Sequence, residues 1–394
     1  MNEWKKCNLG EIAERITSGG TPSTRKSEYY GGDIPWLRTQ EVNFNRIYNT
    51  EICITEEAVE NSSAKFIKEN SIIVAMYGAT AGRIAINKIP LTTNQACCNI
   101  TIDAKKADYN YIYYFLKSKF EGILRMATGA AQQNLNAGML RDFEILAPSL
   151  PTQRHIAQIL TSFDDKIALL GQMNQTLETM AQAIFKEWFV NFNFPGFDGT
   201  LVEGLPKGWR REAIDKDIEF LNGLALQKFP PINEDDYLPV IKIREMRQGV
   251  SSSSDKATTE IPEKYIIEDG EILFSWSGSL EVIIWCNGKG ALNQHLFKVS
   301  SNKYPKWFYY CWTKHFLPIY QSIALDKATT MGHIQRKHLT ESLINVPDFE
   351  VLTKGNDILG PIIEKIINNS VQIRTLTSLR DALLPKLMGG AVFV

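Results

Sequence analysis

The sequence has few of the features that mark several large classes of protein. No apolar run approaches the roughly 20 residues that a bilayer span requires, and residues 1–7 lack the apolar core of a signal peptide. We therefore expect a chain that stays in the cytoplasm, where it is made. Lys and Arg number 43 against 44 for Asp and Glu, so any contact with nucleic acid needs local clusters of cations and cannot rest on bulk attraction.

Residues that bind metals are scarce and wrongly spaced for a metal site. The six cysteines contain no CxxC pair and the five histidines show no ligand spacing, so we predict no metal centre. In the cytoplasm the cysteines are expected to stay reduced and mostly buried as small hydrophobes. The residues are Cys7, Cys53, Cys97, Cys98, Cys286 and Cys311, and His155, His295, His315, His333 and His338.

Motifs of catalysis are absent as well. The sequence contains no glycine-rich phosphate loop, no GxSxG and no Asn/Asp-Pro-Pro-Tyr/Phe tetrapeptide. Pro347-Asp348 could open a nuclease motif, but no lysine stands two positions after Glu350. Ser253 and Lys256 fit the SxxK pattern but lie in a serine-rich stretch that is typical of an exposed turn. We predict a protein without a catalytic centre and without a cofactor of its own.

The chain of 394 residues repeats itself, and it is too long for a single hydrophobic core. A shift of 199 positions places Asn94-Gln95 on Asn293-Gln294, and further upstream residues 34–38 match residues 238–242 at a shift of 204. The shift of 199 preserves apolar class over more than a hundred positions without a gap. This indicates a duplicated unit made of a globular part and a tail, because a period of about 200 is far too long for a solenoid.

Each tail has the pattern of a long helix. Its apolar residues alternate at spacings of three and four, which is the pattern of a coiled-coil seam. At about 1.5 Å per residue the helices would be roughly 55 and 45 Å long, and we expect an antiparallel pair that acts as a spacer. Each seam carries one asparagine, which typically fixes register and partner. The alternative is that each tail is a core helix of an ordinary bundle. The seam residues are Ile156, Leu160, Phe163, Ile167, Leu170, Asn174, Leu177, Ala181, Ile184 and Trp188 in the first copy, and Leu359, Ile362, Ile366, Asn369, Ile373, Leu376, Arg380, Leu383 and Leu387 in the second.

The globular parts are predicted to mix helices and strands. Apolar runs at 71–77 and 271–276 predict strands, and aromatic-rich stretches at 109–124 and 306–323 predict amphipathic helices. Residues 191–208 hold four Gly and two Pro and are expected to form a linker. The fold class is therefore α+β, with two similar mixed α/β domains separated by two long antiparallel helices in a pseudo-twofold internal repeat. The expected parts are domains at 1–150 and 209–350, helices at 151–190 and 351–394, and the linker at 191–208.

Side chains that suit base edges occur at predicted turns in both copies. Amides match the donor and acceptor pair of adenine, and Arg or Lys matches guanine. Tyr77 and Trp276 could stack at a phosphate backbone, although core packing is the alternative for both. The polar candidates are Gln132, Gln133 and Asn134 in the first copy, and His333, Gln335 and Lys337 in the second.

The sharpest basic cluster lies in the second copy. Lys242 and Arg244 stand two apart on a predicted strand, and Arg247 follows just beyond. Arg38 and Gln40 stand opposite them in the first copy. A solvated loop or a surface ion pair is the alternative interpretation for each of these residues.

Several short strings follow one another in a fixed order along the chain. They are Ser18-Gly19-Gly20-Thr21-Pro22-Ser23, GGDIPW at 31–36, YGATAG at 77–82, NQA at 94–96 and QNL at 133–135, followed by 148–160, FKEWFV at 185–190, LPKGW at 205–209 and LRDALLPKL at 379–387. With these strings the whole chain resembles the specificity subunit of a type I restriction-modification system.

The resemblance implies two target-recognition domains that each read one half of a split double-stranded DNA site, joined by conserved helices. It implies a non-catalytic scaffold for two modification subunits, which bind S-adenosylmethionine and methylate adenine, and for restriction subunits, which use ATP and Mg. The candidate DNA contacts then also include Gly19, Gly20, Thr21 and Arg83. The second copy departs from the pattern, because LNGLA at 221–225 replaces the first copy's SGGTP and Trp276-Ser277 replaces Tyr77-Gly78.

Three functions stay open at this point. The first is a DNA-reading scaffold, the second is an enzyme such as a fragment of a fused modification-restriction polypeptide, and the third is a coiled-coil adaptor between proteins without DNA recognition. Half-sites about one helical turn apart, roughly 34 Å, would match the helical spacer, so we favour the scaffold and a bipartite, asymmetric DNA site. Near-neutral charge predicts that the chain alone binds DNA weakly.

Overall fold

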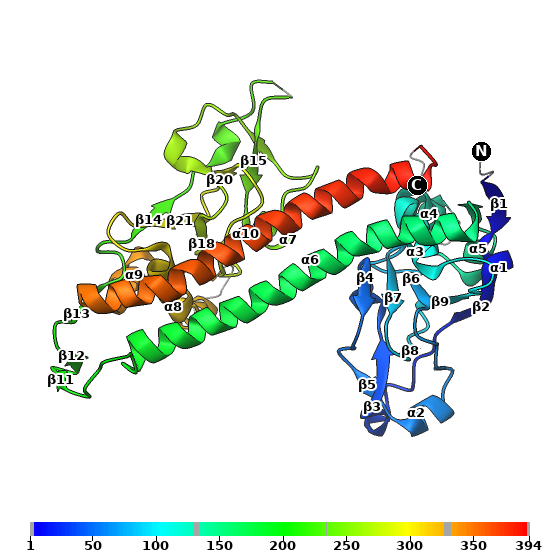
Figure 1. The fold of residues 1–394 in the computed structure, drawn as a ribbon, viewed down its shortest axis with the longest axis horizontal. Helices are drawn as coiled ribbons and strands as arrows, with labels where there is room; N and C mark the ends of the chain where they lie inside the picture. The colour runs from blue at the N-terminus through cyan, green and yellow to red at the C-terminus, as the bar shows by residue number, and fades with distance from the viewer. Residues whose placement is uncertain (1–3, 130–133, 234, 327–331, 392–394) are drawn as a thin grey trace. The chain divides into compact units, whose positions relative to one another are not determined.

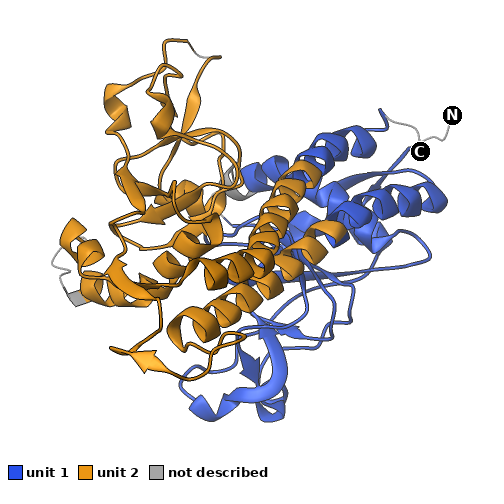
Figure 2. Ribbon diagram, turned by 60° about the vertical axis from the view of Figure 1, so that its left-hand side comes forward, with its two compact units in different colours: residues 1–165, 377–394 blue, residues 166–376 orange. Residues whose placement is uncertain are grey.

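Two long helices, α6 (Leu150–Phe185) and α10 (Phe349–Met388), dominate the computed structural model, which describes residues 4–129, 134–233, 235–326 and 332–391. Figure 1 shows them as the green and red-orange helices. The chain divides into two compact units, and both helices contribute to both of them (Figure 2). Unit 1 holds residues 1–165 and 377–394, and unit 2 holds residues 166–376.

Unit 1 builds three sheets and packs short helices on them. A five-stranded sheet has the order β2-β9-β6-β7-β4, a three-stranded sheet has the order β5-β3-β8, and β1 pairs with β10. Its elements before α6 are β1 Lys5–Asn8, α1 Leu9–Ile12, β2 Ala13–Ser18, η1 Ser27–Tyr29, β3 Tyr30–Leu37, η2 Thr39–Glu41, β4 Asn45–Ile47, β5 Cys53–Ile54, α2 Glu56–Glu60, β6 Ile72–Ala75, β7 Ile84–Asn87, β8 Thr92–Thr93, β9 Cys97–Ile102, α3 Tyr109–Ser118, α4 Phe120–Gly129, α5 Ala137–Arg141 and β10 Glu144–Ala147.

Unit 2 has two four-stranded sheets, in the orders β14-β21-β18-β19 and β16-β15-β20-β17, and two pairs, β11-β12 and β13-β22. Its elements between the long helices are η3 Lys186–Val190, β11 Leu201–Val202, β12 Leu205–Pro206, β13 Arg210–Ala213, β14 Glu219–Asn222, η4 Leu226–Lys228, β15 Leu238–Ile241, α7 Ile243–Gln248, β16 Lys256–Ala257, η5 Glu263–Tyr265, β17 Ile266–Ile267, β18 Ile272–Ser275, β19 Val282–Ile284, β20 Gly290–Leu292, β21 Leu296–Ser300, α8 Lys306–Asp326, α9 Arg336–Thr340 and β22 Leu343–Val346.

The two units repeat one strand order. The order β2-β9-β6-β7 in unit 1 matches β14-β21-β18-β19 in unit 2, and β5-β3-β8 matches β16-β15-β20. The repeat extends to register, because β3 runs parallel to β8 with Leu37 opposite Thr93, and β15 runs parallel to β20 with Ile241 opposite Leu292. These residues stand 204 and 199 positions apart, as the sequence predicts. The predicted fold class with its internal repeat is confirmed.

One detail of the predicted alignment is wrong by a residue. In unit 1 Ile72 stands opposite Ile100, and in unit 2 Ile272 stands opposite Val299. Strands β6 and β18 are therefore related by a shift of 200 positions and not by the predicted 199. The loops that flank the two strands differ in length between the copies, which accounts for the extra residue. As a result Trp276 corresponds to Met76 and not to Tyr77.

The aromatic helix predicted at 109–124 is broken in two. Asp108 caps the start of α3 by accepting a hydrogen bond from the Tyr111 amide at 3.0 Å. The helix ends at Lys119, where the backbone dihedrals leave the helical region at φ −103° and ψ 12°, and α4 then begins at Phe120. In unit 2 the corresponding helix α8 continues to Asp326 with Pro318 inside it.

Helices α6 and α10 run antiparallel and every predicted seam residue is buried or half-buried. Within unit 2, Asn369 Nδ2 donates to Asn174 Oδ1 at 2.9 Å, and Asn174 Nδ2 donates to Ser370 Oγ at 2.9 Å. Within unit 1, Arg380 Nη1 donates to Asp164 Oδ1 at 2.7 Å. Residue numbers rise along α6 while their partners on α10 fall, which fixes the antiparallel direction.

Both long helices supply residues to the hydrophobic core of each unit. In unit 1, Leu160 of α6 and Leu387 of α10 pack in the core with Tyr114 of α3. In unit 2, Phe185 of α6 and Leu359 of α10 pack in the core with the aromatic residues of α8. Each globular part therefore sits on the helix pair through buried apolar area, which is the main source of stabilisation in such an arrangement.

Candidate nucleic-acid interface

Parallel strands bring two predicted polar segments to one edge in each unit. Because neighbouring parallel strands end at the same sheet edge, Arg38 after β3 lies beside Asn94 after β8. The Asn94 amide donates to the Leu37 carbonyl at 2.9 Å. In unit 2 the Asn293 amide donates to the Ile241 carbonyl at 3.3 Å, which places Asn293 beside Lys242.

A glycine in each unit allows the preceding segment to approach this edge. A Cβ atom on Gly19 would lie 2.2 Å from the carbonyl oxygen of Asn94, and a Cβ atom on Gly223 would lie 2.2 Å from that of Asn293. Contacts under 3.0 Å are essentially never tolerated, so no other residue fits without a shift of the backbone. The glycine noted in the first copy therefore has a structural counterpart in the second.

A cationic residue follows each strand end, and its backbone amide is capped by a glutamate three residues later. The Arg38 amide donates to Glu41 Oε1 at 3.1 Å, and the Lys242 amide donates to Glu245 Oε2 at 3.2 Å. The carboxylate satisfies a backbone donor that the short helix leaves free at its start. The prediction of a strand at Lys242 and Arg244 is wrong for this reason, since Lys242 is the N-cap of α7 and Arg244 lies within the helix.

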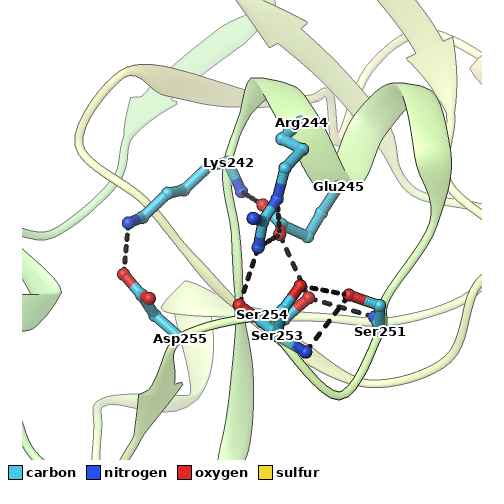
Figure 3. A network of polar contacts seen from close by, with 7 residues as sticks. All are labelled: Lys242, Arg244, Glu245, Ser251, Ser253, Ser254 and Asp255. Carbon is cyan, nitrogen blue, oxygen red and sulfur yellow. Dashed lines mark hydrogen bonds and ion pairs between the residues drawn. The ribbon is translucent and has the colours of Figure 1, made fainter. Parts of the chain in front are cut away.

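A second acid pairs with the side chain of each cation. Arg38 Nη2 donates to Glu51 Oε2 at 2.5 Å, and Lys242 Nζ contacts Asp255 (Figure 3). We call each cation with its two acids a capped-cation site: Arg38, Glu41 and Glu51 in unit 1, and Lys242, Glu245 and Asp255 in unit 2. The hydrogen bond from Lys242 holds the pKa of the Asp255 carboxyl below its usual range.

The capped-cation site of unit 2 has one buried acid, Glu245, and one exposed acid, Asp255. Glu245 accepts hydrogen bonds from Arg244 Nη2 at 2.7 Å and from Ser254 Oγ at 3.0 Å (Figure 3). Burial alone would raise the pKa of the Glu245 carboxyl, but the bonds from Arg244, Ser254 and the backbone outweigh it and lower that pKa. On the side of the exposed acid, a cavity of about 330 Å³ is lined by residues that include Lys242, Asp255 and Asn293.

Both units have a second contact between the same two segments, but the arginine lies on one segment in unit 1 and on the other segment in unit 2. Arg83 Nη1 donates to Asn43 Oδ1 at 2.9 Å in unit 1, whereas Arg247 Nε donates to Glu281 Oε1 at 2.8 Å in unit 2. The ladder of β7 and β19 places Glu281 at the position of Arg83. Each of these predicted DNA contacts is therefore occupied by a partner within its own unit.

Trp276 lies among histidines in unit 2 and is half-buried. Its indole Nε1 donates to Asn222 Oδ1 at 2.9 Å, and its ring lies 5.9 Å from that of His295 and 6.4 Å from that of His333. The neighbouring Ser277 hydroxyl lies 3.1 Å from His295 Nδ1.

The equivalent positions of unit 1 hold Met76, Ala96 and Asn134, so the two units present different side chains at the same place. Tyr77 is half-buried against the core of unit 1.

The remaining predicted residues lie near these elements, with Gln40 in η2, Gln335 at the N-cap of α9 and Lys337 within α9. Gln132 and Gln133 lie outside the described residues, and Asn134 is exposed. Thr21 Oγ1 contacts Gln95 Oε1, and Gly20 is buried beneath the Trp36 indole, whose Nε1 donates to the Gly20 carbonyl at 3.0 Å. Exposed residues of this group are Gln40, Gln335 and Lys337.

Sequence reasoning missed the acids of the capped-cation sites. Glu41, Glu51, Glu245 and Asp255 were not among the predicted contacts, although a signal for them was present. The shift of 204 that relates Arg38 to Lys242 also places Glu41 on Glu245 and Glu51 on Asp255. His295 and Asn222 were missed because they neighbour Trp276 only through the sheet.

Side chains that bind metals are not clustered in the described part of the chain. Among residues 4–129, 134–233, 235–326 and 332–391, no three His, Cys, Asp or Glu side chains are grouped so that they could hold an ion. The six cysteines form no disulfide, and only Cys7 and Cys53 are less than fully buried.

Comparison with known proteins places this chain in a family. Residues 1–179 match the model of the type I restriction modification DNA specificity domain. The chain is 31% identical to the MjaIX type I restriction enzyme specificity subunit of Methanocaldococcus jannaschii, over the whole chain and 94% of that protein. It is 21% identical to the HindI specificity subunit of Haemophilus influenzae, over the full length of both.

A solved structure has the same fold. The specificity subunit of the M. genitalium type I restriction-modification system superposes with a TM-score of 0.62 at 16% sequence identity, covering 98% of this chain and 96% of that one. Duplicated α+β units on a long helix pair are thus the architecture of a known class of restriction-system subunit. The chain belongs to the type I restriction enzyme specificity subunits.

Proposed function

We propose that this chain selects the DNA sequence on which a type I restriction-modification complex acts, by reading a bipartite, asymmetric site with one unit for each half. The observation that carries the proposal is the repeated sheet edge. In both units two parallel strands end at one edge, where a cation lies beside an asparagine, although Asn293 is only 6% exposed; the neighbouring loops differ between the units. A shared frame with different side chains suits two half-sites of different sequence.

The candidate DNA contacts are the side chains and loops at these edges. Arg38, Lys242, Arg83 and Arg247 supply hydrogen-bond donors for guanine or phosphate, and amides such as Asn134 suit adenine. In the free chain these cations already have partners within their own unit. When these cations bind DNA they must therefore exchange their partners in the protein for groups of the DNA. This cost agrees with the expectation that a chain of near-neutral charge binds DNA weakly on its own.

The helix pair would act as a spacer and as a dock for partners. Two modification subunits that bind S-adenosylmethionine, and restriction subunits that use ATP and Mg, would supply the chemistry, with no cofactor on this chain. The proposed parts are recognition domains at 1–150 and 209–350, conserved helices at 151–190 and 351–394, and a linker at 191–208. No helix within the described residues is both long and apolar enough to cross a membrane. The proposed complex acts on DNA, and we place it in the cytoplasm.

The test is methylome sequencing of a host that carries this chain with its modification subunits. The proposal predicts one methylated motif with two defined halves and an undefined gap. A gel shift with the modification subunits separates it from the adaptor hypothesis, since an adaptor would show no sequence preference. Transfer of label from S-adenosylmethionine to DNA by this chain alone would refute the non-catalytic role.

A further inference from the structure

The capped-cation sites repeat in spacing as well as in place. In each unit the first acid follows the cation by three residues and the second acid follows it by thirteen, as Arg38, Glu41 and Glu51 and as Lys242, Glu245 and Asp255. The cation changes from Arg to Lys and the second acid from Glu to Asp, yet the pair persists. Two recognition units that differ in many loop residues therefore keep the same pairing of charges.

The two acids differ in exposure. The side chains of Glu41 and Glu245 are 11% and 1% exposed, and each accepts a backbone hydrogen bond that fixes the cation's own residue. The side chains of Glu51 and Asp255 are 64% and 62% exposed. The first acid thus holds the backbone, although Glu41 Oε1 also lies 3.9 Å from Arg38 Nε, and the second acid faces the solvent from which DNA must approach.

An exposed ion pair contributes little to stability, because water and salt screen it. A phosphate oxygen of DNA can therefore compete with the carboxylate for the same cation. The carboxylate is nevertheless tethered thirteen residues away, which gives it a high effective concentration. Only a phosphate that is held in place by other contacts can displace it.

We propose that Glu51 and Asp255 are positioning residues for DNA discrimination. Each holds the cation of Arg38 or Lys242 away from the phosphates of unmatched DNA and releases it to a phosphate that a matched half-site fixes at this edge. The inference rests on the proposed function and deepens it. Arg244 and Arg247 do not share this role, since Arg244 pairs with the buried Glu245 and Arg247 is matched by an asparagine in unit 1.

The test compares Asp255→Asn and Glu51→Gln with matched control variants. Glu268→Gln in unit 2 and Glu14→Gln in unit 1 remove the same charge from exposed acids that pair with Lys289 and Lys68, at 2.9 and 2.7 Å. Each full chain, assembled with its modification subunits, is titrated with a matched and an unmatched duplex at several salt concentrations. The matched sequence comes from the methylome of the parent complex.

Asp255→Asn is expected to add one phosphate contact to unmatched binding only. The slope of log affinity against log salt then steepens by about 0.9 on the unmatched duplex, an extra loss of roughly 3.5-fold between 50 and 200 mM salt. The slope on the matched duplex stays at the parent value, and the control variants change neither slope. Adding Lys242→Gln to Asp255→Asn should return the unmatched slope to that of the parent.

Equal slopes for Asp255→Asn and Glu268→Gln would overturn the inference, as would a slope that steepens alike on both duplexes. Glu51→Gln tests the inference independently in unit 1 by the same measurement. A parent complex that binds matched and unmatched duplexes equally would instead overturn the proposed function itself.

Discussion

The asparagine pair between α6 and α10 allows a double-mutant cycle with a worked magnitude. Asn369 is only 1% exposed, and its Nδ2 donates to Asn174 Oδ1 at 2.9 Å. Asn369→Leu leaves that oxygen without its donor in the helix interface. A buried polar group that loses its partner costs about 1–3 kcal/mol of folding free energy. Because Asn174 is half-buried, we expect a loss toward the lower end of that range.

The double variant should behave differently from the sum of the single ones. Asn174→Leu with Asn369→Leu replaces both partners of this bond by apolar groups, and such replacements are often neutral or stabilising. The Ser370 hydroxyl loses the donor of Asn174 but keeps its own bond to the Ile366 carbonyl. The coupling energy between the two sites is therefore expected at about 1–3 kcal/mol. Urea unfolding followed by the helical circular-dichroism signal measures it.

Gln175→Leu, at an exposed neighbouring position of α6, is the control for adding leucine to this helix. A double variant that loses as much stability as the two single variants together would refute the reasoning. It would mean that the asparagines contribute independently and that neither depends on the other for its hydrogen bond.

Three further results are expected. Asp164→Asn weakens the charged hydrogen bond from Arg380, at 2.7 Å, and the bond from Tyr114, at 2.6 Å. It should lower the free energy of unfolding in urea by about 1.5–3 kcal/mol, whereas Asp381→Asn, at a more exposed partner of Arg380, should lower it by about 0–1 kcal/mol. Equal losses for the two variants would contradict this expectation. Burial alone would raise the pKa of Glu212, but bonds from Tyr304, Lys216 and Arg210 outweigh it and lower that pKa below 4.5. The stability that separates the parent from Glu212→Gln should thus be fully present above pH 4.5 and vanish as pH falls through the lowered value, whereas a difference that persists in acid would refute this. Gly19→Ala and Gly223→Ala should each lower the melting temperature and weaken sequence-specific DNA binding. The control Gly171→Ala, whose Cβ meets no atom within 4 Å, should leave stability unchanged or raise it. A Gly19→Ala protein with the parent's melting temperature would show that the edge can move to accept the Cβ atom.

The large features of this fold were predictable because they depend on periodic patterns. The spacing of apolar residues indicated two long helices, and the two shifts of 199 and 204 indicated the repeat that the parallel pairs β3-β8 and β15-β20 display. Both features involve dozens of residues, so single exceptions such as Pro361 and Pro385 within α10 do not obscure them.

Local detail was harder to predict because it depends on single hydrogen bonds. Lys242 was expected on a strand, since nothing in the pattern shows that Glu245 turns back to cap its amide. The match of Trp276 with Tyr77 failed by one residue because loops that flank β18 differ in length between the copies. The cations of the edge were found by their charge, whereas their partners Glu51 and Asp255, thirteen residues further on, were missed. The shift of 204 aligns these two acids with each other, but only the fold shows that each pairs with its cation.

The spacer role of the helix pair is tested most directly by the gap in the methylated motif. Seven residues are removed from α6 and the seven that face them are removed from α10, which preserves the heptad pattern on both. Seven helical residues span about 10.5 Å, or about three base pairs of about 3.4 Å each. We predict that methylome sequencing shows both half-sites unchanged and a gap shortened by no more than that amount. A gap of the original length, between the same half-sites, would contradict the account.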